Sequence, residues 1–206
     1  GGYMPEHDSL AANSAEPFFI AVVGDCPVLD GSLVPLLGER AHHNLTNLGA
    51  TSEDCLATLD SIVSVAPRSL VIIVGSSDLA ARQSVEHLVR NIELLLVSVR
   101  RELPGIRTLV QSILPREREF ASAIRDANRH LRQFAPISGS HFLDVWPALA
   151  LDDGELNPAY SVDRVHLNDA GIDALRSELT PAIERLEGAA PMSRPISILP
   201  PGSSRR

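Results

Sequence analysis

Short apolar runs alternate along the chain with longer segments of helical periodicity. Residues 70–74 are continuously apolar and mostly β-branched, which is typical of a strand covered on both faces. In segment 79–102, apolar side chains recur at three- and four-residue spacing, as on an amphipathic helix. The same reasoning predicts strands at 18–23, 43–48, 70–74, 107–113 and 141–145. It predicts helices at 30–39, 52–65, 79–102, 117–134 and 169–187.

Regular alternation of strands and helices predicts a parallel sheet with helices packed on both faces. We therefore expect an α/β fold, a three-layer α/β/α sandwich around a five-stranded parallel sheet. A chain of 206 residues with 44% hydrophobic residues fits one globular domain, which we assign to residues 17–189. Residues 1–16 and the segment 190–206, which is rich in Pro, Ser and Arg, are predicted to be disordered.

Charge and cysteine content exclude several classes of function. The formal net charge is −8, which argues against nucleic acid as a partner, because phosphate binding needs a basic surface. No apolar run approaches the roughly 20 residues that span a bilayer, so we expect no membrane span. Two cysteines and no leader-like start favour a reduced, cytoplasmic setting.

Candidate chemistry lies at the two ends of the predicted domain. Cys26 follows the first strand, and Asp163 and His166 stand three residues apart just before the last helix. In a parallel sheet the reactive groups gather at the carboxyl ends of the strands, so these side chains can meet. A thiol, an imidazole and a carboxylate form a nucleophile, a base and an orienting acid. Such chemistry needs no cofactor, and the pattern predicts no metal site.

Four short blocks occur in order on these elements. They are Gly-Asp-Cys at 24–26, Asn-Leu-Gly-Ala-Thr at 47–51, Val-Gly-Ser-Ser-Asp-Leu at 74–79, and Asp-Arg-Val-His-Leu-Asn at 163–168. Together they resemble the blocks of the SGNH (GDSL-type) hydrolases, which implies the flavodoxin-like form of the sandwich. Two positions depart from that family: Cys26 stands where it has Ser, and Ser77 stands where it has Asn.

The resemblance also implies a role for each residue. Cys26 takes the place of the nucleophile, His166 that of the general base, and Asp163 that of the acid that orients the imidazole. The backbone N–H groups of Cys26 and Gly49 are implied donors of an oxyanion hole, with Ser77 in place of the usual Asn. Asp25 and Asp78 are given structural roles, and we interpret Cys55 as a core residue.

A Cys–His pair reacts through a thioester, which amines and thiols attack better, relative to water, than they attack an oxygen ester. The sequence therefore favours an acyl-transfer enzyme (an acyltransferase, or an esterase or thioesterase). Its substrate would be a small acyl ester or thioester, for example one carried by coenzyme A or a carrier protein. The alternative is an inactive pseudoenzyme that binds a ligand or partner, because both Ser and Asn are replaced. The sequence alone also leaves open that Cys26 was introduced in place of a natural Ser.

Overall fold

A computed structural model describes residues 19–189 of the chain, so the predicted disordered segments 1–16 and 190–206 lie outside the described residues. Five parallel strands form one sheet in the order β2-β1-β3-β4-β5. The strands are β1 (Ile20–Asp25), β2 (His42–Asn47), β3 (Ser69–Ile73), β4 (Arg107–Gln111) and β5 (His141–Leu143). The predicted five-stranded parallel sheet is therefore confirmed.

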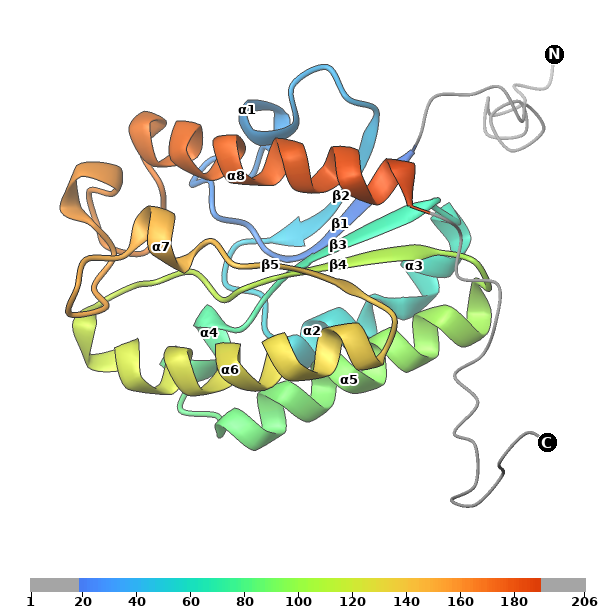
Figure 1. Ribbon diagram of the computed structural model, residues 1–206, viewed down its shortest axis with the longest axis horizontal. Coiled ribbons are helices and arrows are strands. Elements are labelled where there is room, and N and C mark those ends of the chain that lie inside the picture. Colours follow the sequence, from blue (N-terminus) through green and yellow to red (C-terminus); the bar gives the residue numbers. More distant parts are fainter. Residues whose placement is uncertain (1–18, 190–206) are drawn as a thin grey trace, which may run out of the picture.

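Helices cover both faces of this sheet and complete a three-layer sandwich (Figure 1). One face carries α1 (Val34–Leu37), α7 (Trp146–Leu149) and α8 (Asp169–Gly188). The other carries α2 (Ser52–Ala57), α3 (Leu59–Val65), α4 (Ser76–Ala80), α5 (Val85–Glu102) and α6 (Ala121–Ile137). Two short 3-10 turns, Arg118–Phe120 and Pro158–Tyr160, precede α6 and α8. The predicted α/β/α architecture is confirmed.

Each face of the sheet has its own apolar core because successive strand side chains point to opposite sides. All five residues of β3 are buried, as its continuous apolar run predicts. In β1, Val22 packs toward α8, while Ala21 and Val23 pack toward α5. Cys55 is buried in the second of these cores, so its interpretation as a core residue is confirmed.

Several predicted helices differ in extent, and local chemistry explains why. The predicted helix 52–65 is divided at Thr58, and the predicted helix 79–102 is divided before Ser84. Ser84 begins α5 by accepting a hydrogen bond from the backbone N–H of His87, a typical N-cap. The segment 30–39, predicted to be one helix, contains only the single turn α1.

The helix that the sequence predicts from residue 52 is capped by the residue before it. Thr51 caps α2 through a reciprocal pair of hydrogen bonds with Asp54. Ser52 is instead buried and binds the carboxylate of Asp78, a partner from another segment that no local pattern indicates. At α8 the cap is local: Asn168 accepts a hydrogen bond from the N–H of Gly171, which agrees with the predicted start of this helix at residue 169.

Candidate active site

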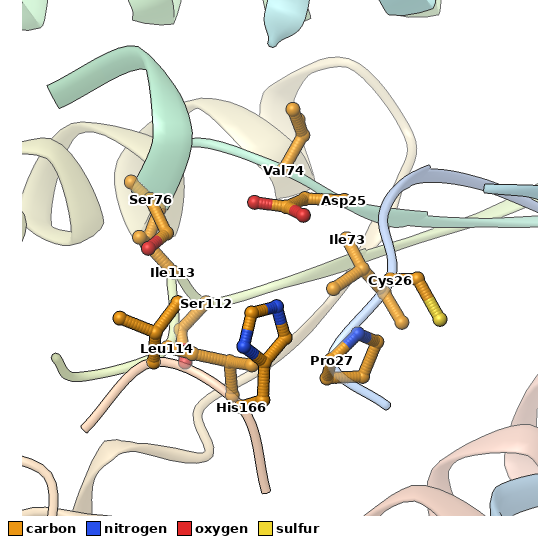
Figure 2. Close-up of a pocket in the computed structure, with 11 residues that line it drawn as sticks. Asp25, Cys26, Pro27, Ile73, Val74, Ser76, Ser112, Ile113, Leu114 and His166 are labelled. Atoms are coloured by element: carbon orange, nitrogen blue, oxygen red, sulfur yellow. The ribbon is translucent and has the colours of Figure 1, made fainter. Parts of the chain in front are cut away.

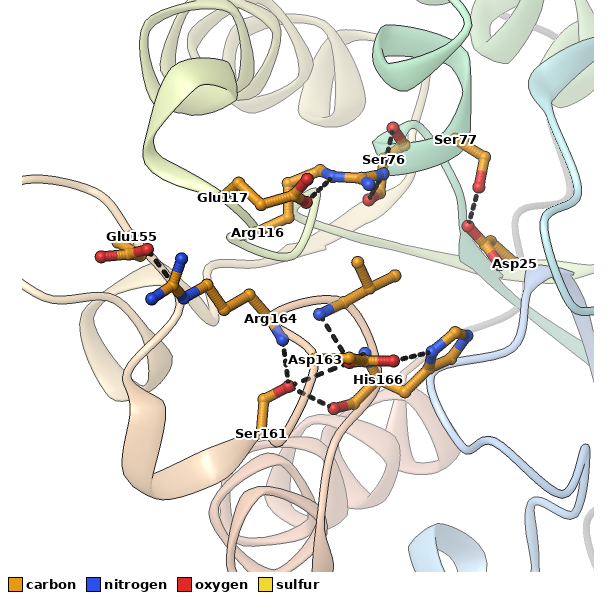
Figure 3. Close-up of polar contacts among 11 residues, drawn as sticks. Asp25, Ser76, Ser77, Arg116, Glu117, Glu155, Ser161, Asp163, Arg164 and His166 are labelled. Atoms are coloured by element: carbon orange, nitrogen blue, oxygen red, sulfur yellow. Dashed lines mark hydrogen bonds and ion pairs between the residues drawn. The ribbon is translucent and has the colours of Figure 1, made fainter.

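Asp163 and His166 form a hydrogen-bonded pair in the loop that leads into α8. The Nδ1 atom of His166 lies 2.8 Å from Oδ2 of Asp163, so the structure brings these two predicted site residues together. The other oxygen of Asp163 accepts the backbone N–H groups of Val165 and His166, at 2.9 and 2.7 Å. These bonds fix the carboxylate, which in turn fixes the orientation of the imidazole (Figure 3).

The loop that carries this pair is itself held by Ser161. Its hydroxyl donates to the carbonyl oxygen of His166 at 2.6 Å and accepts the backbone N–H of Arg164 at 2.8 Å. Burial opposes ionisation of Asp163. The hydrogen bonds from His166 and Val165 outweigh burial and hold the pKa of this carboxyl well below its usual range. Asp163 is therefore a carboxylate near neutral pH, the form that can orient and stabilise a charged imidazole.

The cleft beside His166 lies at the carboxyl ends of β1, β3 and β4 (Figure 2). Its polar lining consists of Asp25, Cys26, Ser76, Ser112 and His166. Its apolar lining consists of Pro27, Ile73, Val74, Ile113, Leu114 and Val165. A small cleft in which apolar walls surround a few converging polar groups is typical of a small-molecule site.

Cys26 lies close to the cleft, but its thiol is turned away from it. The residue is 2% exposed, and its S–H donates to the carbonyl oxygen of Val28 at 3.4 Å. Figure 2 shows the sulfur directed away from the imidazole of His166. In the described part of the chain, the thiol is thus placed in the core beside α8, and the structure does not pair it with the predicted base.

The three predicted oxyanion donors are all engaged by the protein itself. The N–H of Cys26 donates to the carbonyl oxygen of Asn47 at 3.1 Å. The N–H of Gly49 donates to Oδ1 of Asp25 at 2.9 Å, and the hydroxyl of Ser77 donates to Oδ2 of Asp25 at 2.5 Å. Gly49 and Ser77 therefore converge on a carboxylate of the chain, while Cys26 donates elsewhere.

Asp25, to which the sequence assigned only a structural role, also lines the cleft. Burial raises the pKa of Asp25, and the hydrogen bonds from Ser77 and Gly49 and the charges of His166 and Arg116 oppose this rise. Its carboxylate faces the cleft from above the imidazole of His166 (Figure 2). One signal could have found it: strand alternation places Asp25 and Cys26 on opposite faces of the sheet, so only one can point toward any given group.

Asp78 has the structural role that the resemblance implies. It is fully buried and accepts both the N–H and the hydroxyl of Ser52, at 2.9 and 2.5 Å. Asn91 of α5 donates to the same hydroxyl at 2.9 Å, which extends the network to another helix. Burial raises the pKa of Asp78 against the opposing effect of these bonds. The network connects the start of α2 to α4 and so positions the loop of Gly49 and the first turn of α4, which carries Ser77.

Removal of this carboxylate is expected to destabilise the fold. Asp78→Ala leaves the buried N–H of Ser52 without its acceptor, which should lower the free energy of unfolding by about 1–3 kcal/mol. Urea denaturation followed by circular dichroism measures the change. Asp152→Ala, at an exposed position, is the control and should leave stability nearly unchanged. Equal stability of the two variants would contradict a structural role for Asp78.

Comparisons with known proteins agree with this fold. The model of the GDSL-like lipase/acylhydrolase family matches residues 8–174. A GDSL-like lipase from Bacteroides thetaiotaomicron superposes with a TM-score of 0.72 at 19% identity, over 87% of this chain and 95% of that one. A member of the lipolytic G-D-S-L family from Veillonella parvula gives 0.66 at 10%, over 81% and 98%.

An acetyl xylan esterase, AlAXEase, gives a TM-score of 0.66 at 14% identity, over 80% of this chain and 99% of that one. At such identities, the likeness to solved structures shows the fold alone. The comparison with curated proteins gives no match. Among the described residues, no helix has both the length and the apolar character that crossing a bilayer requires.

Proposed function

Because this chain belongs to the GDSL-like lipase/acylhydrolase family, we propose that it hydrolyses or transfers the acyl group of a small ester or thioester. The observation that carries the proposal is the imidazole of His166, held by Asp163 and presented to the cleft. A neutral imidazole held in one orientation can take a proton from a nucleophile and return it to a leaving group. The apolar lining of the cleft suits the acyl chain.

Cys26 is the nucleophile that we propose. Attack by this thiol requires Sγ to move from the core to the cleft through a change of its χ1 rotamer, which breaks the hydrogen bond to Val28. The sulfur then bonds to the acyl carbon, its proton passes to Nε2 of His166, and that proton leaves with the departing alcohol or thiol. Water or another acceptor, deprotonated by the same imidazole, releases the acyl group and restores the thiol.

Candidate donors follow from this chemistry. A thioester of coenzyme A or of a carrier protein supplies a good leaving group, and a small oxygen ester supplies the same acyl group. Whether water or an amine, alcohol or thiol accepts the acyl group decides between hydrolase and transferase. A cytoplasmic setting stays a prediction, one that agrees with the use of a free thiol.

The test is the mass of the intact protein after brief incubation with p-nitrophenyl butyrate or butyryl-coenzyme A. We expect one butyryl adduct on the wild type and none on Cys26→Ala. Cys55→Ala is the matched control, because Cys55 is equally buried and its environment raises the pKa of this thiol to about 12. An adduct that persists in Cys26→Ala contradicts Cys26 as the nucleophile.

One observation favours a second function, ligand binding without catalysis. The N–H of Cys26 and both other predicted oxyanion donors are engaged within the protein, and the thiol lies in the core. A protein that only binds a ligand does not need these donors or this thiol to be available for reaction. Absence of both adduct and ester turnover, together with binding of butyrate in the cleft, would favour this function.

A further inference from the structure

The carboxyl group of Asp25 lies where the donors of an acyl oxyanion are expected. Strand alternation turns Asp25 away from α8, and its carboxyl group reaches between the loop of Gly49 and the first turn of α4. Gly49 and Ser77 each donate to one of its oxygens. Position 77 also lacks the amide that would normally donate to the substrate oxygen. The carboxyl group of Asp25, which lines the cleft, is thus the group that can contact the ligand oxygen there.

We propose that the protonated carboxyl group of Asp25 binds the oxyanion of the ligand. Its O–H donates the hydrogen bond that an Asn amide at position 77 would otherwise supply. This inference rests on the proposed function, because it assigns a further catalytic residue to the same site. A protonated carboxyl group has one O–H donor and keeps its carbonyl oxygen as an acceptor. Its carbonyl oxygen can retain the N–H of Gly49 while the hydroxyl turns to the ligand.

The ionised form of Asp25 has the opposite effect. A carboxylate beside a developing oxyanion places two negative charges in contact. It also accepts the hydrogen bonds of Gly49 and Ser77, which are then not available to the ligand. The charged groups that act on Asp25 are His166, from the loop before α8, and Arg116, from the segment after β4. Apolar side chains of Ile73 and Val74 line the same cleft. Such an apolar setting favours the neutral acid, as in other sites that hold a carboxyl group protonated.

The sign of the pH dependence follows from this role. Burial raises the pKa of Asp25 from its ordinary value, so the neutral acid persists to higher pH than in a free carboxyl group. The ability of the site to bind an anionic oxygen is present below this raised pKa and is lost as the pH rises through it.

Asp25→Asn and Asp25→Ala form the matched pair that tests the proposal. An Asn amide donates at every pH, so kcat/KM of Asp25→Asn for p-nitrophenyl butyrate should not fall on the alkaline side of its pH profile. At alkaline pH it should exceed kcat/KM of the wild type by about 10²-fold. Asp25→Ala lacks the donor and should fall about 10²–10³-fold below Asp25→Asn at every pH. If Asp25 only holds its loop, both variants should be less active than the wild type throughout.

Ser77→Ala provides a second variant. The hydroxyl of Ser77 lowers the pKa of Asp25, so its removal raises that pKa and should move the alkaline limb of activity to higher pH. An unchanged limb in Ser77→Ala would overturn the assignment of that limb to Asp25.

Binding of butyrate separates this inference from the proposed function. Calorimetry should show that the wild type binds ionised butyrate more tightly as the pH falls, that Asp25→Asn binds it independently of pH, and that Asp25→Ala binds it weakly. This pattern without any acyl adduct or turnover would contradict the proposed function and leave the role of Asp25 standing. Wild-type affinity independent of pH, or equal affinity in the Asn and Ala variants, overturns it whatever the activity.

Discussion

His166→Ala is expected to lower kcat/KM for p-nitrophenyl butyrate by about 10²–10⁴-fold, the usual contribution of a positioned general base. Nδ1 of His166 is engaged by Asp163 at 2.8 Å, so the other ring nitrogen is left to exchange protons in the cleft. No other imidazole lines the cleft among the described residues. The loss should therefore appear in kcat as well as in kcat/KM, because the base acts in both acylation and deacylation.

A histidine outside the cleft provides the control. His87 on α5 pairs with Glu53 at 2.7 Å, and His87→Ala should keep the activity of the wild type. Asp163→Asn should give an intermediate loss, because the imidazole remains but loses the carboxylate that stabilises its charged form. Denaturation curves confirm that each variant is folded before rates are compared. Full activity in His166→Ala would show that the ester reacts elsewhere.

Local sequence signals predicted most of the fold. The apolar run in β3 and the regular alternation of elements specified the sheet and the two helical layers, because burial on both faces leaves few other arrangements. Breaks within helices were harder to predict. The division at Thr58 and the non-helical residues before Ser84 depend on tertiary contacts and capping that periodicity does not record.

The part of the candidate site whose residues are close in sequence could be predicted. Asp163 and His166 stand three residues apart in one loop, so their spacing alone allows the hydrogen bond that the structure contains. Cys26 and Asp25 depend on how β1 presents its end to two distant loops. The short hydrogen bond from Ser77 to Asp25 joins residues 52 positions apart, and only the packed sheet brings them together. A motif match gives residue types but not the rotamer of a thiol.

Gly24→Ala is expected to produce the largest loss of stability, about 4 kcal/mol or more, because strain and overpacking add. Gly24 pairs with Ile73 across β1 and β3 and has a φ of +123°, a region in which residues other than glycine are strained. A Cβ atom at this position would lie 1.9 Å from the carbonyl oxygen of Ile73. The backbone of a central strand cannot move away from the added Cβ atom, whereas the end of a flexible side chain could.

The midpoint of urea denaturation measures this effect. Gly188→Ala is the control, because the added Cβ meets no atom within 4 Å and the residue has no positive φ. If Gly24→Ala folds at all, β1 and β3 must separate, and Asp25 must leave the N–H of Gly49 and the hydroxyl of Ser77. Loss of pH-dependent butyrate binding should then accompany the loss of stability. Stability equal to that of Gly188→Ala would show that β1 does not need this close approach to β3.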